Sequence, residues 1–195
     1  MVTVRKGLPP ALRWKGAQLY WEAFGAKLGR VLGPEDRALV FFDRVIRGDH
    51  CVIALDSSGV LLGLAGFKTV EGSFAGGTWA DLRAVYGPFG GLWRGAALWA
   101  LSREVDNDRF LMDGLCVTAP SRGQGVGTAL MQAICDEALV RGYASVRLDV
   151  VVSNVRARQL YEREGFVATR TQRLGLLRHL FGFAATVTMV RMLRP

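Results

Sequence analysis

A glycine-rich segment in the second half of the chain carries residue types that can bind a phosphate group. It reads Arg122-Gly123-Gln124-Gly125-Val126-Gly127-Thr128 and joins an apolar run that ends at Val117 to a helical pattern that begins at Val126. The first N–H groups of a helix lack partners within the helix, and the helix dipole places about half a positive charge there. Glycine has no Cβ, so its backbone can come close to a pyrophosphate. The segment therefore predicts an anion site at a strand-to-helix junction.

The spacing of the glycines separates this loop from two other phosphate-binding loops. A dinucleotide-binding fingerprint needs G-x-G-x-x-G, and its third glycine would fall on Thr128. A P-loop ends in Gly-Lys-Ser/Thr, and no lysine lies near this segment. The pattern that fits is R-x-x-G-x-G, formed by Arg122, Gly125 and Gly127.

A second segment follows the next strand-like run. It reads Asn154-Val155-Arg156-Ala157-Arg158-Gln159-Leu160-Tyr161-Glu162-Arg163-Glu164-Gly165-Phe166. Together the two segments resemble motifs A and B of the GNAT N-acetyltransferase superfamily. Motif A is Gln or Arg, two residues, Gly, one residue and then Gly or Ala, whereas motif B is an Asn followed by Ala, Leu-Tyr and Gly-Phe at fixed spacing. The distance between the segments also matches that family, and the resemblance is strong from about Phe110 to Phe166.

The resemblance implies where acetyl-CoA would bind as cosubstrate. The backbone N–H groups of the glycine-rich loop would hold the pyrophosphate, and Arg122 would add a positive charge. Strand residues before the loop would pair their backbone with the pantetheine arm, as an added strand does. Asn154 would contact the pantetheine and also suits a helix N-cap. The predicted cofactor-binding residues are Leu115, Cys116, Val117, Arg122, Gly123, Gln124, Gly125, Val126, Gly127, Thr128 and Asn154.

Two residues are candidates for proton transfer. The resemblance places Tyr161 near the sulfur, where it would be the general acid that protonates the departing thiolate; the alternative is a core aromatic with a solvated hydroxyl. Asp113 is a carboxylate within an apolar strand, which is unusual. By strand alternation it shares a face with Leu111, Leu115 and Val117. It is either the base for the amine or a structural partner of an arginine. The weaker alternative bases are Glu71, Asp81 and Glu104.

Composition limits the class of protein. The chain has 195 residues, half of them apolar, and a formal charge of +8, which suits one domain over residues 1–195. Most of the basic residues are arginines, which suit phosphate. No basic run interleaved with aromatics or zinc-finger spacing occurs, so we expect a phosphorylated small molecule in place of nucleic acid. The two histidines, His50 and His179, lie far apart in the sequence, and we expect no metal site.

The cysteines and the apolar stretches of the chain indicate the cellular compartment in which we expect the protein. Cys51, Cys116 and Cys135 are odd in number and lie in apolar stretches, which indicates reduced core residues of a cytoplasmic protein. Cys116 has no histidine in its motif, so it is not expected to be a nucleophile. Residues 1–10 lack the apolar core of a signal peptide, and no stretch has the ~20 apolar residues of a membrane span.

Apolar periodicity and turn residues predict the elements that position these groups. We expect helices at residues 11–32, 34–47, 92–104, 126–141 and 154–164. We expect strands at residues 2–5, 51–55, 60–68, 111–117, 145–152, 166–171 and 185–192, with an apolar loop at 174–183. This order predicts a GNAT-type mixed α/β sheet, splayed between the strands that end at Val117 and Val152 and flanked by helices.

An aromatic and glycine-rich insertion spans about residues 71–109 and ends in a polar turn at residues 106–108. Its aromatic residues either pack in the core or wall an acceptor pocket, since the insertion lies between the hairpin and the cofactor strand. These residues are Trp79, Tyr86, Phe89, Trp93 and Trp99.

The predicted function is transfer of an acyl group, most simply acetyl from acetyl-CoA, to a primary amine by direct attack in a ternary complex. A backbone N–H, that of Cys116 or Val117, would stabilise the oxyanion. The alternative is a non-catalytic acyl-CoA sensor that regulates a partner; a DNA-binding protein ranks below both. The acceptor stays open among a polyamine or amino acid, an aminoglycoside-like compound, a peptide N-terminus and a protein lysine. A homodimer also stays open.

Overall fold

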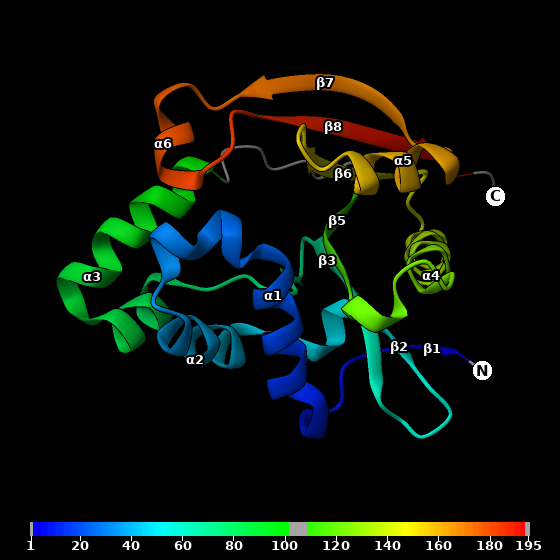
Figure 1. Cartoon of the computed structure of the whole chain (residues 1–195), viewed down its shortest axis with the longest axis horizontal. Coiled ribbons are helices and arrows are strands. Elements are labelled where there is room, and N and C mark those ends of the chain that lie inside the picture. The colour runs from blue at the N-terminus through cyan, green and yellow to red at the C-terminus, as the bar shows by residue number, and fades with distance from the viewer. Residues whose placement is uncertain (1, 102–108, 194–195) are drawn as a thin grey trace.

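A mixed β-sheet forms the centre of the molecule (Figure 1). The computed structural model describes residues 2–101 and 109–193 of the chain, and within these the strand order is β1-β2-β3-β5-β6-β8-β7, with β4 paired to β3. The pair β5–β6 is parallel, and its neighbours in the sheet pair antiparallel. The strands are β1 Thr3–Lys6, β2 Cys51–Leu55, β3 Leu61–Thr69, β4 Gly72–Ser73, β5 Phe110–Val117, β6 Ser145–Val151, β7 Val167–Arg173 and β8 Ala185–Met192.

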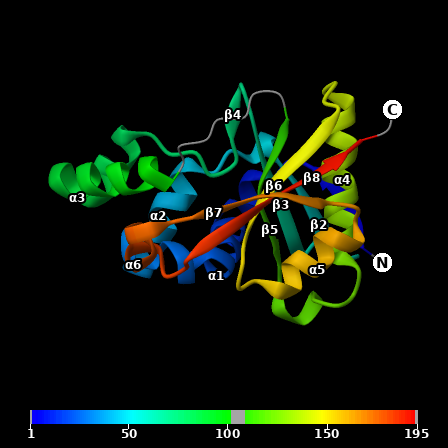
Figure 2. The ribbon, with the colours of Figure 1, turned by 90° about the horizontal axis from the view of Figure 1, so that it is seen from above.

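Helices cover both faces of the sheet and leave a separate apolar core on each. The helices are α1 Arg13–Leu32, α2 Glu35–Val45, α3 Trp79–Leu101, α4 Val126–Val140, α5 Val155–Arg163 and α6 Arg178–Phe181. Figure 2 shows α1, α2, α3 and α6 on one side, with α4 and α5 on the other. Tyr20, Phe42 and Phe74 belong to the core under α1, whereas Phe67 and Leu130 belong to the core under α4. The predicted mixed α/β sheet flanked by helices is confirmed.

Two predicted segments differ from the structure. The helix expected at residues 92–104 is the second part of α3, which begins earlier, at Trp79. A break at Gly87 (φ 76°, ψ 175°) divides α3, and Pro88 starts the second helical stretch. The apolar stretch at 174–183, expected as a loop, contains α6 and buries Phe181 in the core under α1. The predicted polar turn at 106–108 lies outside the described residues. Within them, no helix is long and apolar enough to cross a membrane.

The aromatic insertion forms α3, which stands at the outer edge of the molecule against α2 (Figures 1 and 2). Tyr86 is buried, and its hydroxyl donates to the Leu32 carbonyl oxygen, so the packing interpretation holds for this residue. The other four aromatics are exposed: Trp79, Phe89, Trp93 and Trp99. Their position beyond α2, away from β5 and β6, argues against the prediction that they wall an acceptor pocket.

An ion-pair cluster ties the first strand to α4, the helix that follows the glycine-rich loop. Glu137 is buried, and its Oε1 atom lies 2.5 Å from Lys6 Nζ and 2.5 Å from Arg141 Nε. Arg141 also pairs with Glu71 at 3.3 Å. Burial raises the pKa of Glu137, but the hydrogen bonds from Lys6 and Arg141 outweigh it, and the net effect holds the pKa below its usual value of 4.5.

We predict that Glu137→Gln destabilises the fold at neutral pH by about 1–2 kcal/mol, because two cations lose a charged acceptor. The folded-state pKa is depressed, so the carboxylate stabilises the fold above pH 4.5 and loses that contribution as the pH falls below it. Urea unfolding at several pH values measures both effects. The variant and the wild type should converge in acid; a constant difference across pH would contradict the ionic explanation.

Candidate functional site

The sheet separates between β5 and β6. These parallel strands pair only at Phe110–Val146 and Leu111–Arg147. Beyond those pairs β5 continues to Val117 along β3, whereas β6 continues to Val151 along β8. The facing edges past Leu111 and Arg147 therefore have no ladder between them. This confirms the predicted splay and leaves backbone N–H and C=O groups of β5 facing the gap.

The glycine-rich loop lies at the open end of this gap, where β5 leads into α4. Gly123 and Gly125 have left-handed backbone angles (φ 76° and 80°), which favour glycine. A Cβ on either would meet no protein atom within 4 Å, so the loop surface is open. Gly125 is the N-cap of α4 and supplies no side-chain cap. The N–H groups at the start of α4 therefore point out of the helix without a side-chain acceptor at the cap.

Side chains of the loop fold back on its own backbone. Arg122 Nε donates to the Val117 carbonyl oxygen at 3.1 Å, and Gln124 Nε2 donates to the Pro120 carbonyl oxygen at 2.8 Å. Both bonds hold the loop against the end of β5 and leave its N–H groups uncovered. The predicted phosphate contact of Arg122 remains a prediction; in the structure its Nε atom closes the loop.

Gly127 has a different role from the two left-handed glycines. A Cβ there would lie 3.2 Å from Leu160 Cδ2 and about as close as van der Waals contact to Leu115 and Val117. The missing side chain lets the first turn of α4 approach both β5 and α5. This close packing brings the two sequence motifs together at one end of the gap.

The start and middle of α5 face this region. Asn154 is the N-cap of α5, and its Oδ1 atom accepts from the Ala157 N–H at 3.3 Å, which confirms the predicted capping role. Tyr161 is buried beside Phe166, with ring centroids 6.1 Å apart. Burial raises the pKa of Tyr161 above its usual value of 10.0, and the Cys116 thiol adds to the shift. Tyr161 therefore keeps its proton at neutral pH and lies within electrostatic reach of β5.

Asp113 does not lie where strand alternation placed it. Gly66 pairs with Gly114 and Phe67 with Met112, so Asp113 is the extra residue of a β-bulge. The prediction that it shares a face with Leu115 and Val117 is wrong, because the bulge interrupts the alternation. Its Oδ2 atom accepts from the Ser73 hydroxyl at 2.7 Å.

The Asp113 carboxylate lies on the α1 side of β5. After burial, it is the second cause of the raised pKa of Tyr20, a residue of α1. The Asp113 Oδ2 atom accepts from the Ser73 hydroxyl and, at 3.5 Å, from the Ala75 N–H, in place of the arginine expected for a structural role. Of the weaker candidate bases, Glu71 pairs with Arg141 and Asp81 pairs with Arg44 at 2.7 Å, while Glu104 lies outside the described residues.

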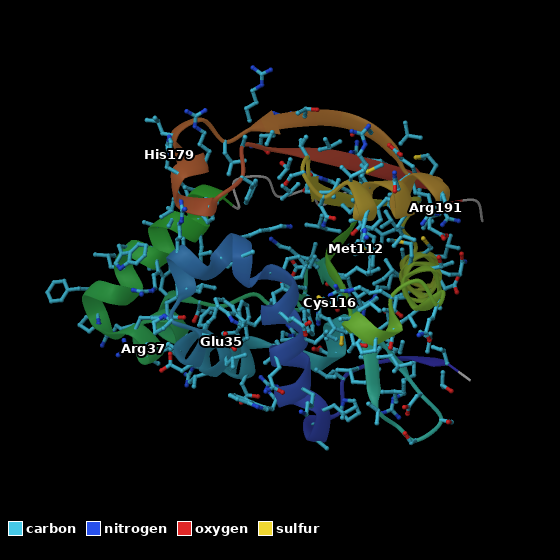
Figure 3. The ribbon with its side chains drawn as sticks, viewed as in Figure 1. Glu35, Arg37, Met112, Cys116, His179 and Arg191 are labelled. Carbon is cyan, nitrogen blue, oxygen red and sulfur yellow. The ribbon has the colours of Figure 1, made fainter. Side chains whose placement is uncertain are left out.

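The α1 side of β5 holds residues that the sequence analysis did not select. Tyr20 and Phe24 of α1 lie directly over Gly114, since a Cβ there would meet Phe24 at 2.8 Å and Tyr20 at 3.3 Å. Cys116 is buried on this same side (Figure 3). Lys27 lies one turn beyond Phe24, with Nζ 5.2 Å from its ring centroid. The spacing of Tyr20, Phe24 and Lys27 along one helical face was the available signal.

The cysteines and histidines behave as buried or separate groups. Cys51, Cys116 and Cys135 are free and buried, which confirms their core assignment. Burial raises the pKa of the Cys116 thiol far above its usual range, so it is a poor nucleophile. Among residues 2–101 and 109–193, no three His, Cys, Asp or Glu side chains form a group that could hold a metal ion.

Comparisons with known proteins agree with this geometry. The family model for the acetyltransferase (GNAT) family matches residues 15–166, so the chain belongs to the GNAT acetyltransferase family. No curated protein gives a match.

Similar solved structures share the fold at low identity. An N-acetyltransferase from Staphylococcus aureus Mu50 has a TM-score of 0.68 at 15% identity, with 96% of this chain and 99% of that chain covered. A GCN5-related N-acetyltransferase from Kribbella flavida has a TM-score of 0.61 at 18% identity, with 98% of each chain covered. An acetyltransferase has a TM-score of 0.65 at 15% identity, with 98% of this chain and all of that chain covered.

We predict that Tyr161 is protonated well beyond pH 10 in the folded protein. Its folded-state pKa is raised, so its burial stabilises the fold fully below pH 10 and loses that contribution as the pH rises further. Tyr161→Phe should therefore lose less stability than the wild type between about pH 8 and about pH 11. Urea unfolding across this range tests the difference, and phenolate absorbance should show one late-titrating tyrosine fewer. Parallel stability curves for the two proteins would contradict the buried phenol.

Proposed function

We propose that the protein transfers an acetyl group from acetyl-CoA to a primary amine by direct attack within a ternary complex. The observation that carries this proposal is the gap between β5 and β6, which opens beside the uncovered N–H groups at the start of α4. A strand edge next to an anion site suits a ligand that has an amide-bearing arm and a pyrophosphate. Membership of the GNAT family supports the same cosubstrate.

The residues present fit acetyl-CoA. The N–H groups from Gln124 to Thr128 would hold its pyrophosphate, and the open space at Gly123 and Gly125 would admit it. The backbone of Leu115, Cys116 and Val117, on the edge of β5 that faces the gap, would pair with the pantetheine arm. Asn154, which caps α5, would contact the same arm while its Oδ1 atom holds the helix start.

The chemistry follows from what lies on the two sides of β5. The neutral amine attacks the thioester carbonyl carbon, a C–N bond forms, and the C–S bond breaks. A backbone N–H, that of Cys116 or Val117, stabilises the oxyanion. Asp113, held by Ser73 on the α1 side, accepts the amine proton directly or through water. Tyr161, on the α5 side, gives its proton to the departing thiolate and then recovers one from solvent.

Three buried, free cysteines support our proposal that the protein works in the reducing cytoplasm. A homodimer remains a prediction. A non-catalytic sensor would need the cosubstrate loop but no proton donor at Tyr161, so the two experiments below distinguish the classes.

Gly125→Ala should weaken acetyl-CoA binding. Its Cβ would project into open space at the site proposed for the pyrophosphate, and the left-handed backbone adds about 1–2 kcal/mol of strain. Gly142→Ala is the matched control, because Gly142 ends the same helix with the same φ of 80° and the same open surroundings. Calorimetry should show weaker binding for Gly125→Ala alone, with similar stability losses in both. Equal affinity in the two variants would mean that the loop does not hold the pyrophosphate.

Tyr161→Phe should lower turnover about 10²- to 10³-fold, the lower part of the range for general acid catalysis, since a thiol is a fairly acidic leaving group. The ring is retained, so acetyl-CoA affinity should change little. Release of free thiol with a panel of amines measures turnover, and calorimetry measures affinity. Asp113→Asn should also lower turnover and leave acetyl-CoA affinity nearly unchanged. Full turnover in Tyr161→Phe with a true acceptor would exclude Tyr161 as the acid.

A further inference from the structure

One face of α1 carries a lysine in an otherwise apolar and aromatic stripe. Residues Ala17, Tyr20, Phe24, Lys27 and Val31 follow one another at helical spacing. Ala17 and Val31 are fully buried and Tyr20 is 6% exposed, so this stripe faces the sheet. Lysine is rarely placed on such a face unless its charge has a partner. The position of Lys27 therefore calls for a physical reason.

The stripe lies against β5 on the face of the sheet opposite α4. Phe24 rests on Gly114, and Lys27 lies one turn further along α1 with Nζ over the Phe24 ring. Cys116 and Lys27 each alter the pKa of the other, so the ammonium lies within electrostatic reach of the end of β5.

The short helix α6 packs beside the same part of α1, as Figure 1 shows. Arg30 donates to the carbonyl oxygen of His179, which binds the two helices together. Figure 3 shows His179 on α6, at the end of α1 opposite its N-terminus. Lys27 thus lies in the corner formed by α1, α6 and β5, next to the gap.

Lys27 has no carboxylate partner in the described part of the chain. No Asp or Glu oxygen there lies within 4.0 Å of its Nζ atom, which instead lies over the face of the Phe24 ring. Burial lowers its pKa, and the opposing effect of Cys116 does not cancel that shift. Lys6 offers the contrast, because its ammonium pairs with Glu137 at 2.5 Å. A half-buried cation without a counterion is costly, and an anion bound there would offset that cost.

We propose that Lys27 binds a carboxylate on the acceptor, so that the acceptor is an amine that also carries a carboxylate group, as amino acids and short peptides do. This inference rests on the function proposed above. Asp113 and Lys27 lie on the same side of β5 with opposite charges, and so match the ammonium and the carboxylate of such a molecule. A polyamine or an aminoglycoside has no anion to offer Lys27.

A carboxylate suits this site better than a phosphate. Lys27 is a single point charge with three donors, whereas phosphate sites usually add an arginine fork or a row of backbone N–H groups. The neighbouring Arg30 is already bonded to the carbonyl oxygen of His179. The row of N–H groups lies at the start of α4, on the opposite face of the sheet from α1.

Matched pairs of acceptors test the proposal. The amines are glycine, β-alanine and γ-aminobutyrate, in which the carboxylate lies progressively farther from the nitrogen, each beside its carboxamide. The wild type should prefer at least one carboxylate over its carboxamide by about 10- to 100-fold in kcat/KM. Lys27→Met should remove this preference by lowering kcat/KM for the carboxylate acceptor and leaving kcat/KM for the carboxamide unchanged. Lys27→Arg should keep part of it.

Control variants separate binding of the acceptor from other roles. Lys15→Met removes an exposed lysine from the same helix and should leave the preference unchanged. Lys27→Met should fold with stability equal to or above the wild type, because an unpaired buried cation is replaced by an apolar chain of similar length. If Lys27→Met does not fold, the test becomes the carboxylate preference of the wild type and its partial loss in Lys27→Arg.

Two results would overturn the inference and leave the proposed function intact. One is a wild type that acetylates other amines and shows no preference within any pair. The other is a Lys27→Met variant that loses activity equally on carboxylate and carboxamide or binds acetyl-CoA more weakly, which would assign Lys27 to the fold or to the cosubstrate. Absence of thiol release with every amine would instead contradict the proposed function itself.

Discussion

Hydrogen bonds missing from the middle of the sheet are the constraint on which the rest of this structure depends. β5 and β6 pair over two residues and then separate, although both continue for several residues more. Buried N–H and C=O groups rarely lack partners, because each one costs about as much as a lost hydrogen bond. A fold can keep such a gap only if other contacts hold both halves of the sheet, and if a ligand or water reaches the open edges.

The two halves are held by different means. On one side, β5 pairs with β3 from Gly63 to Lys68, and α1 rests on Gly114. On the other side, β6 and β7 each pair with β8 along most of their length. Helix α4 lies across the first half and contacts β1, β2, β3 and β5, with the Glu137 ion pairs fixing β1 to it. The gap is therefore bordered by two separately paired halves of the sheet, which are joined by contacts such as that of Gly127 with Leu160 and that of Arg30 with His179.

The parts of this arrangement that the sequence could predict are those governed by local rules. The glycines at 123, 125 and 127 mark a strand-to-helix turn whatever surrounds them, and Asn154 caps α5 through a bond three residues away.

The bulge at Asp113 could not be predicted in this way. It depends on which residue of β3 pairs with which residue of β5, and a single extra residue reverses every side chain beyond it. Ser73 likewise meets Asp113 only because β4 folds back on β3. The aromatic residues of the insertion were predicted to pack in the core or, from the place of the insertion between the hairpin and the cofactor strand, to wall a pocket. In the structure α3 packs on α2 through Tyr86 and leaves the other four aromatics exposed.

In the proposed mechanism, the bulge would also let two kinds of proton transfer share one strand. In a regular strand Asp113 would point toward α4 and α5, the side where Tyr161 lies, and a carboxylate and a phenol would then compete for one region. The extra residue instead turns Asp113 toward Ser73 and Tyr20, under α1, while Leu115 and Val117 still face Gly127 and Leu160. An anionic group and a cationic one, Asp113 and Lys27, thus lie on one side of β5, and a neutral phenol that keeps its proton lies on the other. The strand edge between them carries only backbone groups. Such a division would let an acceptor and a thioester reach the same peptide groups from opposite sides, as the proposed direct transfer between two bound molecules requires.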